Sequence, residues 1–157
     1  MSDDYVSELS PLQIIQLADD FIKTASTPHS AMEAVVGLLK ANFAYYDWVG
    51  IYILSGANTL KLGPFQGEPS PHNVIPIDQG ICGAAVREGQ TIIVPDVNAD
   101  PRFLACSLAT KSEIVVPIKR GVKVLGEIDI DSNAADAFHE KDREMLEAVA
   151  GKLAEIL

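Results

Sequence analysis

The sequence predicts a single domain of the mixed α/β class, of the α+β type, in which helices pack against antiparallel strands. Two capped helical stretches open the chain, two β-hairpin patterns follow, and an amphipathic stretch ends it. The length of 157 residues corresponds to about one domain, and 48% hydrophobic residues are enough for a real core. We therefore expect one domain over residues 1–157, with residues 1–9 as a disordered or short acidic lead-in.

A first helix is expected to begin at Ser10. This residue is followed by Pro11 and by Gln13, a combination typical of a capping box with proline in the first turn. After Pro28, a second capping box at Ser30–Glu33 is expected to open a second helix. The apolar positions at helical spacing are Ile14, Leu17, Ala18, Phe21, Ile22 and Ala25, then Met32, Val35, Val36, Leu39 and Phe43.

Two β-hairpins are expected after the helix pair. Residues rich in Val, Ile and aromatic side chains at Trp48–Leu54 are followed by a turn and by Thr59–Leu62. The second hairpin joins Ser112–Ile118 to Val122–Asp131. The other segments are a loop at Gly67–Asn73, a short helix at Gly80–Gly89, a strand at Thr91–Val94, an irregular segment at Asp96–Thr110 and a final helix at Phe138–Leu157.

Charge and cysteine content exclude several classes of function. The 12 Lys and Arg against 22 Asp and Glu leave a net charge of −10, which disfavours nucleic acid and anionic membrane surfaces as partners. Two cysteines are too few for a disulfide scaffold, and Met1–Asp4 is acidic where a signal peptide is basic. No apolar run is long enough for a transmembrane helix. We expect a cytoplasmic protein.

Three acidic residues share one face of the last predicted strand. The alternation of side chains places Glu127, Asp129 and Asp131 together, opposite the apolar residues between them. One interpretation is a solvated strand face, because exposed strand faces are routinely polar. The other is a binding site, because Asp is depleted from strands and like charges repel at this spacing.

Whether Glu113 joins these acids depends on the loop of the second hairpin. A two-residue turn would pair Glu113 with Ile128, on the opposite face. A three-residue loop at Arg120–Val122 would pair Glu113 with Asp129. Carboxyl groups gathered in this way raise one another's pKa, so that one of them can act as a general acid. A hard cation is a weaker alternative, since no metal-loop spacing accompanies the cluster, and we expect no bound metal.

The two cysteines are candidates for redox chemistry. Cys82 lies near the start of the short helix, where the helix dipole favours a thiolate, and Cys106 lies in a loop. The alternative for each is a small buried apolar residue. His29, His72 and His139 are assigned no catalytic role.

Six motifs are spread over the sequence: Trp48–Tyr52, Gly63–Gly67, Gly80–Gly83, Ala105-Cys106, Ser112–Pro117 and Ile128–Ser132. Together they resemble the free methionine-R-sulfoxide reductase branch of the GAF domain family. The resemblance implies a central antiparallel sheet of about six strands, with helices on one side and a ligand pocket on the other, in a homodimer.

The same resemblance implies a catalytic role for both cysteines. Members of this branch reduce free methionine-R-sulfoxide with a cysteine that becomes a sulfenic acid, and a second cysteine then closes a disulfide. Cys106 matches the attacking cysteine and Cys82 matches another cysteine of the family. No bound cofactor is implied, and an external thiol such as thioredoxin supplies the electrons.

The acids and two aromatic residues match substrate-binding positions. By resemblance, Glu113 and Asp129 protonate the sulfoxide oxygen and Asp131 holds the ammonium group of the substrate. Trp48 and Tyr52 match aromatic residues that line the pocket for the methyl end. A protonated acid and a buried negative partner for an ammonium group are what this reaction needs.

One departure from the family pattern concerns recycling. The family typically has a further cysteine after the Gly63–Gly67 segment, and Ser70–Asn73 stands there instead. Either Cys82 resolves the sulfenic acid of Cys106 in its place, or the activity is lost. The alternative function is a non-catalytic GAF module that binds an amino acid or another small ligand.

Overall fold

The computed structural model describes residues 8–104 and 108–157, and it contains one six-stranded sheet in the order β3-β2-β1-β6-β5-β4. All the neighbouring strands pair antiparallel. The strands are β1 (Trp48–Ser55), β2 (Thr59–Gln66), β3 (Val74–Pro76), β4 (Ile92–Val94), β5 (Ser112–Arg120) and β6 (Lys123–Ser132). The helices are α1 (Pro11–Thr24), α2 (Pro28–Asn42), α3 (Gly80–Glu88) and α4 (Glu140–Ala154), with the 3₁₀ turn η1 (Val97–Ala99).

The start of α1 agrees with the sequence, whereas α2 begins earlier than expected. Ser10 caps α1, and its Oγ accepts a hydrogen bond from the backbone N–H of Gln13 at 3.2 Å. The cap of α2 is Thr27 instead of Ser30, with Pro28 as the first helical residue. The prediction from Ser30 was wrong because proline loses no hydrogen bond in the first turn of a helix, so it opens α2 and does not interrupt it.

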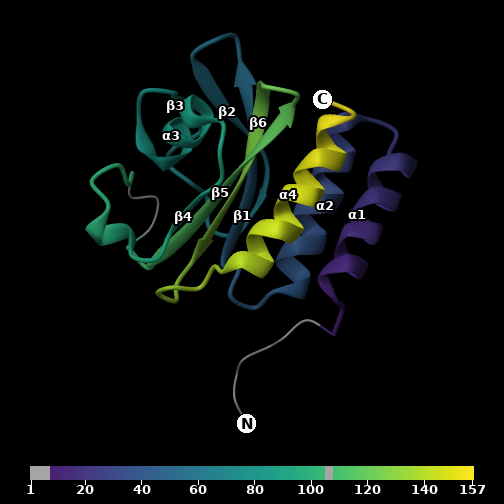
Figure 1. Ribbon diagram of the computed structural model, residues 1–157, viewed down its shortest axis with the longest axis horizontal. Coiled ribbons are helices and arrows are strands. Elements are labelled where there is room, and N and C mark those ends of the chain that lie inside the picture. Colours follow the sequence, from purple (N-terminus) through teal and green to yellow (C-terminus); the bar gives the residue numbers. More distant parts are fainter. Residues whose placement is uncertain (1–7, 105–107) are drawn as a thin grey trace.

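Helices cover both faces of the sheet, in unequal numbers. In Figure 1, α1, α2 and α4 lie together on one side, and α3 lies on the other side beside β3. Along β6 the side chains alternate, so Ile128 and Ile130 pack toward the three helices. The expectation of helices on one side therefore holds for α1, α2 and α4 and is wrong for α3. The opposite face carries a second, smaller apolar cluster, which includes Tyr52 and Cys82.

A buried acid ties α4 to the segment that leads into β1. Asp142, which is 2% exposed, accepts hydrogen bonds from the hydroxyls of Tyr45 and Tyr46, both at 2.6 Å on Oδ1. Its Oδ2 accepts from the backbone N–H of His139 at 2.9 Å. These bonds hold the segment before β1 against the start of α4. In the part of the chain that the structure describes, no helix is both long and apolar enough to span a bilayer.

The β5–β6 hairpin has a register that neither expected loop produces. Arg120 pairs with Lys123, so the loop has two residues, and a register shift next to Ile118 leaves Leu125 as an extra residue in β6. Glu113 consequently pairs with Asp131 and not with Asp129 or Ile128. The prediction of an odd-length loop was wrong. The bulge shifts the pairing by one residue, as an odd-length loop would have done. The side chain of Glu113 therefore lies on the same face of the sheet as the acids of β6.

Candidate active site

The acids of β5 and β6 form a buried cluster on the face that α3 covers. We call Glu113, Glu127, Asp129 and Asp131 the acid cluster; their exposed fractions are 5%, 0%, 2% and 3%. The interpretation of a solvated strand face was therefore wrong. The strand pattern alone does not show this burial, because the covering helix and loops come from other parts of the chain.

The acid cluster has no cationic partner among the described side chains. The ion pairs of the described residues all involve other carboxylates. Four of its carboxyl oxygens are buried without a hydrogen-bond partner in the described residues: both of Glu127 and one each of Asp129 and Asp131. Unpaired buried carboxylates are costly, so the cluster is expected to hold protons or to bind a cationic group.

Burial raises the pKa of every member of the cluster, and the charge of a neighbouring acid raises it further for Glu113, Glu127 and Asp131. Loss of solvent raises the pKa of Glu113 well above its ordinary value, and the charges of Asp129 and Asp131 raise it further. Burial also raises the pKa of Asp129, but a hydrogen bond from Glu113 partly offsets this effect. Glu113 and Asp129 share this hydrogen bond, so a proton held by the pair is available at either carboxyl group.

The stability of the protein is expected to fall as the pH rises from about 5 to about 8. The folded pKa of the cluster lies above the unfolded value, so the folded state binds more protons in this range. The free energy of unfolding decreases by up to about 1.4 kcal/mol per pH unit for each group that titrates. Urea unfolding at each pH measures this slope.

Two substitutions make that measurement specific. Asp129→Asn should flatten the slope, whereas Glu144→Gln, at an exposed position of α4, should leave it unchanged. A free energy of unfolding that rises between pH 5 and 8 would contradict the raised pKa values.

Cys82 lies against the acid cluster as a buried thiol. It belongs to the first turn of α3, is 5% exposed, and packs in the smaller apolar cluster. Burial raises the pKa of the Cys82 thiol well above its ordinary value, and the charges of Asp129, Glu127 and Glu113 raise it further. The prediction of a thiolate was wrong because these effects outweigh the helix dipole. One ligating atom each of Cys82, Glu113 and Asp129 lie within 4.8 Å of one another.

Trp48 and Tyr52 hold the loop between β2 and β3 over this face. The indole Nε1 of Trp48 donates to the backbone oxygen of Glu68 at 2.9 Å, and the Tyr52 hydroxyl donates to that of His72 at 2.8 Å. The two rings are 6.5 Å apart between centroids. Gly50 lies under the indole, where a Cβ atom would come within 2.2 Å of the Trp48 ring. A glycine in this strand is therefore required for the ring to lie across the sheet.

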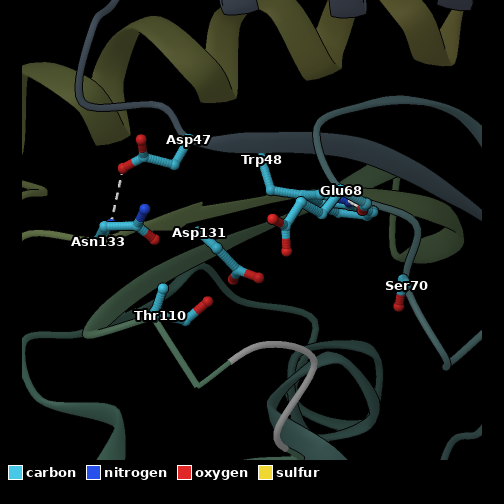
Figure 2. A pocket seen from close by; sticks show the side chains of 8 residues that line it. Asp47, Trp48, Glu68, Ser70, Thr110, Asp131 and Asn133 are labelled. Atoms are coloured by element: carbon cyan, nitrogen blue, oxygen red, sulfur yellow. Dashed lines mark hydrogen bonds between the residues drawn. The ribbon is translucent and has the colours of Figure 1, made fainter.

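A pocket opens where Asp131 reaches the surface of this face. Figure 2 shows Asp131 projecting from β6 into the space bordered by Thr110 and Glu68. The pocket has a volume of about 140 Å³. Its remaining lining residues are Asp47, Trp48, Ser70, Ala109 and Asn133. Ser70 stands in the region where the family pattern has a cysteine, and its Oγ accepts a hydrogen bond from the backbone N–H of His72 at 3.0 Å.

A second, smaller cavity lies deeper on the same face. Glu113, Asp129, Cys82 and Tyr52 line it, together with Leu104. Asp129 and Asp131 are two residues apart on β6, so the smaller cavity and the open pocket are neighbours. Five predicted site residues are thus brought together here with Trp48 beside them. Cys106 lies outside the described residues, and its position is not part of this geometry.

Sequence reasoning missed several polar residues of the open pocket. Asp47 precedes β1, and its Oδ2 accepts from the backbone N–H of Asn133 at 2.7 Å. Glu68 and Thr110 come from two loops. These residues are far apart along the chain and follow no periodic pattern. One signal in the sequence points to Asp47 and Asn133, because both residues lie close to the end of a predicted strand.

The fold and the buried site define a GAF domain. The family model described as "GAF domain" matches residues 27–157, and the chain belongs to this family. It is 46% identical over 107 residues to the free methionine-R-sulfoxide reductase of Saccharomyces cerevisiae, an alignment that covers 66% of this chain and 59% of the yeast protein.

Solved structures show the same likeness over more of the chain. The type II free methionine-R-sulfoxide reductase of Thermoplasma acidophilum is 37% identical with a TM-score of 0.80, and the match covers 88% of this chain and 94% of that one. The enzyme of Neisseria meningitidis, solved in complex with its substrate, is 29% identical with a TM-score of 0.89; coverage is 99% and 95%.

Proposed function

We propose that this protein is a thiol-dependent reductase that converts free L-methionine-R-sulfoxide to methionine. The observation that carries the proposal is the buried acid cluster, which opens into a pocket and lies against a thiol without any cationic partner among the described side chains. The likeness to reductases of this substrate supports the same conclusion. A GAF module that only binds a ligand has no need for a buried thiol beside protonated acids.

Three members of the acid cluster, Glu113, Asp129 and Asp131, can perform two tasks in this reaction. The sulfoxide oxygen leaves as part of a hydroxyl group, so it must receive a proton, and Glu113 with Asp129 is placed to supply one. Asp131 faces the open pocket, where its carboxylate can hold the ammonium group of a free amino acid. Trp48 and Tyr52 supply the apolar wall for the methyl end of the side chain.

The thiols carry the electrons. The thiol of Cys106 attacks the sulfoxide sulfur and forms a sulfur–sulfur bond, and the acids protonate the sulfoxide oxygen. The hydroxyl group then moves to the sulfur of Cys106 as the sulfur–sulfur bond breaks, so methionine leaves and Cys106 becomes a sulfenic acid. The thiol of Cys82 then attacks the sulfenic acid, which forms a disulfide and releases water. An external dithiol such as thioredoxin reduces this disulfide, and no bound cofactor is needed. Support for Cys106 comes from the sequence motif, and support for Cys82 comes from its place beside the acids.

Compartment and assembly complete the proposal. We place the protein in the cytoplasm, because the cycle needs cysteines that a reducing compartment returns to the thiol form. We also propose a homodimer, so light scattering at micromolar concentration is expected to give about twice the chain mass of 16.9 kDa. A species of the single-chain mass would contradict the dimer and leave the chemistry untouched.

Selectivity for the free amino acid tests the proposed function. Because Asp131 is expected to require a free ammonium group, the protein should reduce L-methionine-R-sulfoxide and show little activity on its N-acetylated, C-amidated form. Oxidation of NADPH coupled through thioredoxin measures both rates. The R and S epimers of the free amino acid provide a matched pair in the same assay. Equal turnover of the blocked compound would contradict the role of Asp131.

A further inference from the structure

Three buried side chains from three separate elements meet at the smaller cavity. Cys82 comes from α3, Glu113 from β5 and Asp129 from β6, and one ligating atom of each lies within 4.8 Å of the other two. The sequence showed no metal-site spacing because these residues lie far apart along the chain. Only folding brings the thiol and the carboxyl groups together.

No cationic side chain among the described residues pairs with these ligands, so their charge would need another partner once they lose their protons. One carboxyl oxygen of Asp129 is buried without a hydrogen-bond partner among the described residues. A free amino acid supplies one ammonium group but brings a carboxylate of its own, so it adds no net positive charge. A divalent cation would compensate two deprotonated ligands at once.

The chemistry and size of the site select among cations. A thiol with two carboxyl groups is a ligand set for Zn²⁺, whereas Mg²⁺ and Ca²⁺ take oxygen ligands. Zinc bond lengths of about 2.0–2.3 Å place tetrahedral ligand atoms about 3.5 Å apart, which modest side-chain rotation can reach from the present spacing. The cavity volume of about 10 Å³ suits a single particle of water size.

We propose that the reduced protein binds one Zn²⁺ ion through Cys82, Glu113 and Asp129, and that the ion and the sulfoxide substrate exclude each other. The inference rests on the proposed function in one respect, since it takes the acid cluster as the substrate site. Zinc would occupy the proton-donating acids and the second thiol at once. The metal therefore acts as an inhibitor that the free amino acid displaces.

Zinc binding is measured on the reduced full-length protein by competition with a chromophoric zinc chelator. The expected result is one tightly held zinc ion per chain, with Mg²⁺ unable to displace it. Cys82→Ser should weaken zinc binding by at least about tenfold, because it replaces a soft sulfur ligand with a hydroxyl of nearly the same size. Asp129→Asn, which keeps the shape of the side chain, is a second variant that should weaken zinc binding.

Cys106→Ser is the matched control, since it removes the other thiol of the chain and leaves all three ligands in place. This variant should bind zinc as the unsubstituted protein does, and free methionine-R-sulfoxide should displace the ion from it without being reduced. Zinc binding that Cys82→Ser leaves unchanged, or that Cys106→Ser abolishes, would overturn the site. Failure of the sulfoxide to displace zinc would overturn the competition.

The two proposals fail separately. A protein that reduces methionine sulfoxide but holds no zinc would refute the metal site alone. A protein that binds zinc at Cys82 but leaves the sulfoxide intact after the zinc has been removed would refute the reductase alone.

Discussion

Asp129→Asn is expected to slow the reduction of free methionine-R-sulfoxide by about a hundredfold or more. Asp129 is 2% exposed and lines the smaller cavity with Glu113, with which it shares a hydrogen bond. An asparagine has the same shape but cannot pass a proton to the sulfoxide oxygen. Steady-state rates with dithiothreitol as the reductant measure the effect without dependence on a protein partner.

Glu127→Gln is the matched control for this substitution. Glu127 lies on the same face of β6 and is 0% exposed, but it lines neither of the two cavities of the site. It should keep most of the rate. Asp129→Asn should also leave the free energy of unfolding level or raised, because it relieves like-charge repulsion in the cluster. A rate within about tenfold of the unsubstituted protein would contradict the role of Asp129 as a proton donor.

Cys106→Ser and Cys82→Ser are expected to fail in different ways. Cys106→Ser should produce no methionine, because serine does not form the sulfenic acid on which the reaction depends. Cys82→Ser should produce about one methionine per chain and then stop when thioredoxin is the reductant, because no second thiol closes the disulfide. Rapid-quench measurement of methionine distinguishes a single turnover from none.

The burial of Cys82 adds one condition to this assignment. The burial that raises the pKa of its thiol makes Cys82 a poor nucleophile until the site opens or the proton moves to a neighbouring acid. The disulfide step is therefore expected to be slower than the attack by Cys106. Steady turnover of Cys82→Ser with thioredoxin would contradict the resolving role.

The order of elements could be predicted because each depends on local pattern. Helical spacing after Ser10 and β-rich runs at Trp48 and Ser112 indicate α1, β1 and β5 without reference to the rest of the chain. The short strand β3 and the turn η1 were missed, since three residues carry no periodicity. Their pairing partners lie elsewhere in the sequence, so only the folded sheet defines them.

The sequence predicts which residues form the candidate site. It does not predict how β5 and β6 pair or which side chains are protonated. The acidic residues of β6 and the partner Glu113 follow from alternation, yet the bulge at Leu125 changes their pairing. Bulges leave no reliable signal in a single sequence. The protonated state of Cys82 depends on α3 covering the acids, a contact between segments far apart in the chain. Burial and the charges of the nearby acids raise the pKa of the Cys82 thiol by more than its position in the helix lowers it.

One measurement tests the central claim most directly: mass spectrometry of the reduced protein after one equivalent of free L-methionine-R-sulfoxide, with methionine quantified in the same sample. We expect close to one methionine per chain and a loss of two thiols, with Cys82 and Cys106 joined in one disulfide. In Cys82→Ser the expected product is a single oxygen adduct on Cys106. An unmodified Cys106, with no disulfide, no oxygen adduct and no methionine formed, would contradict the reductase.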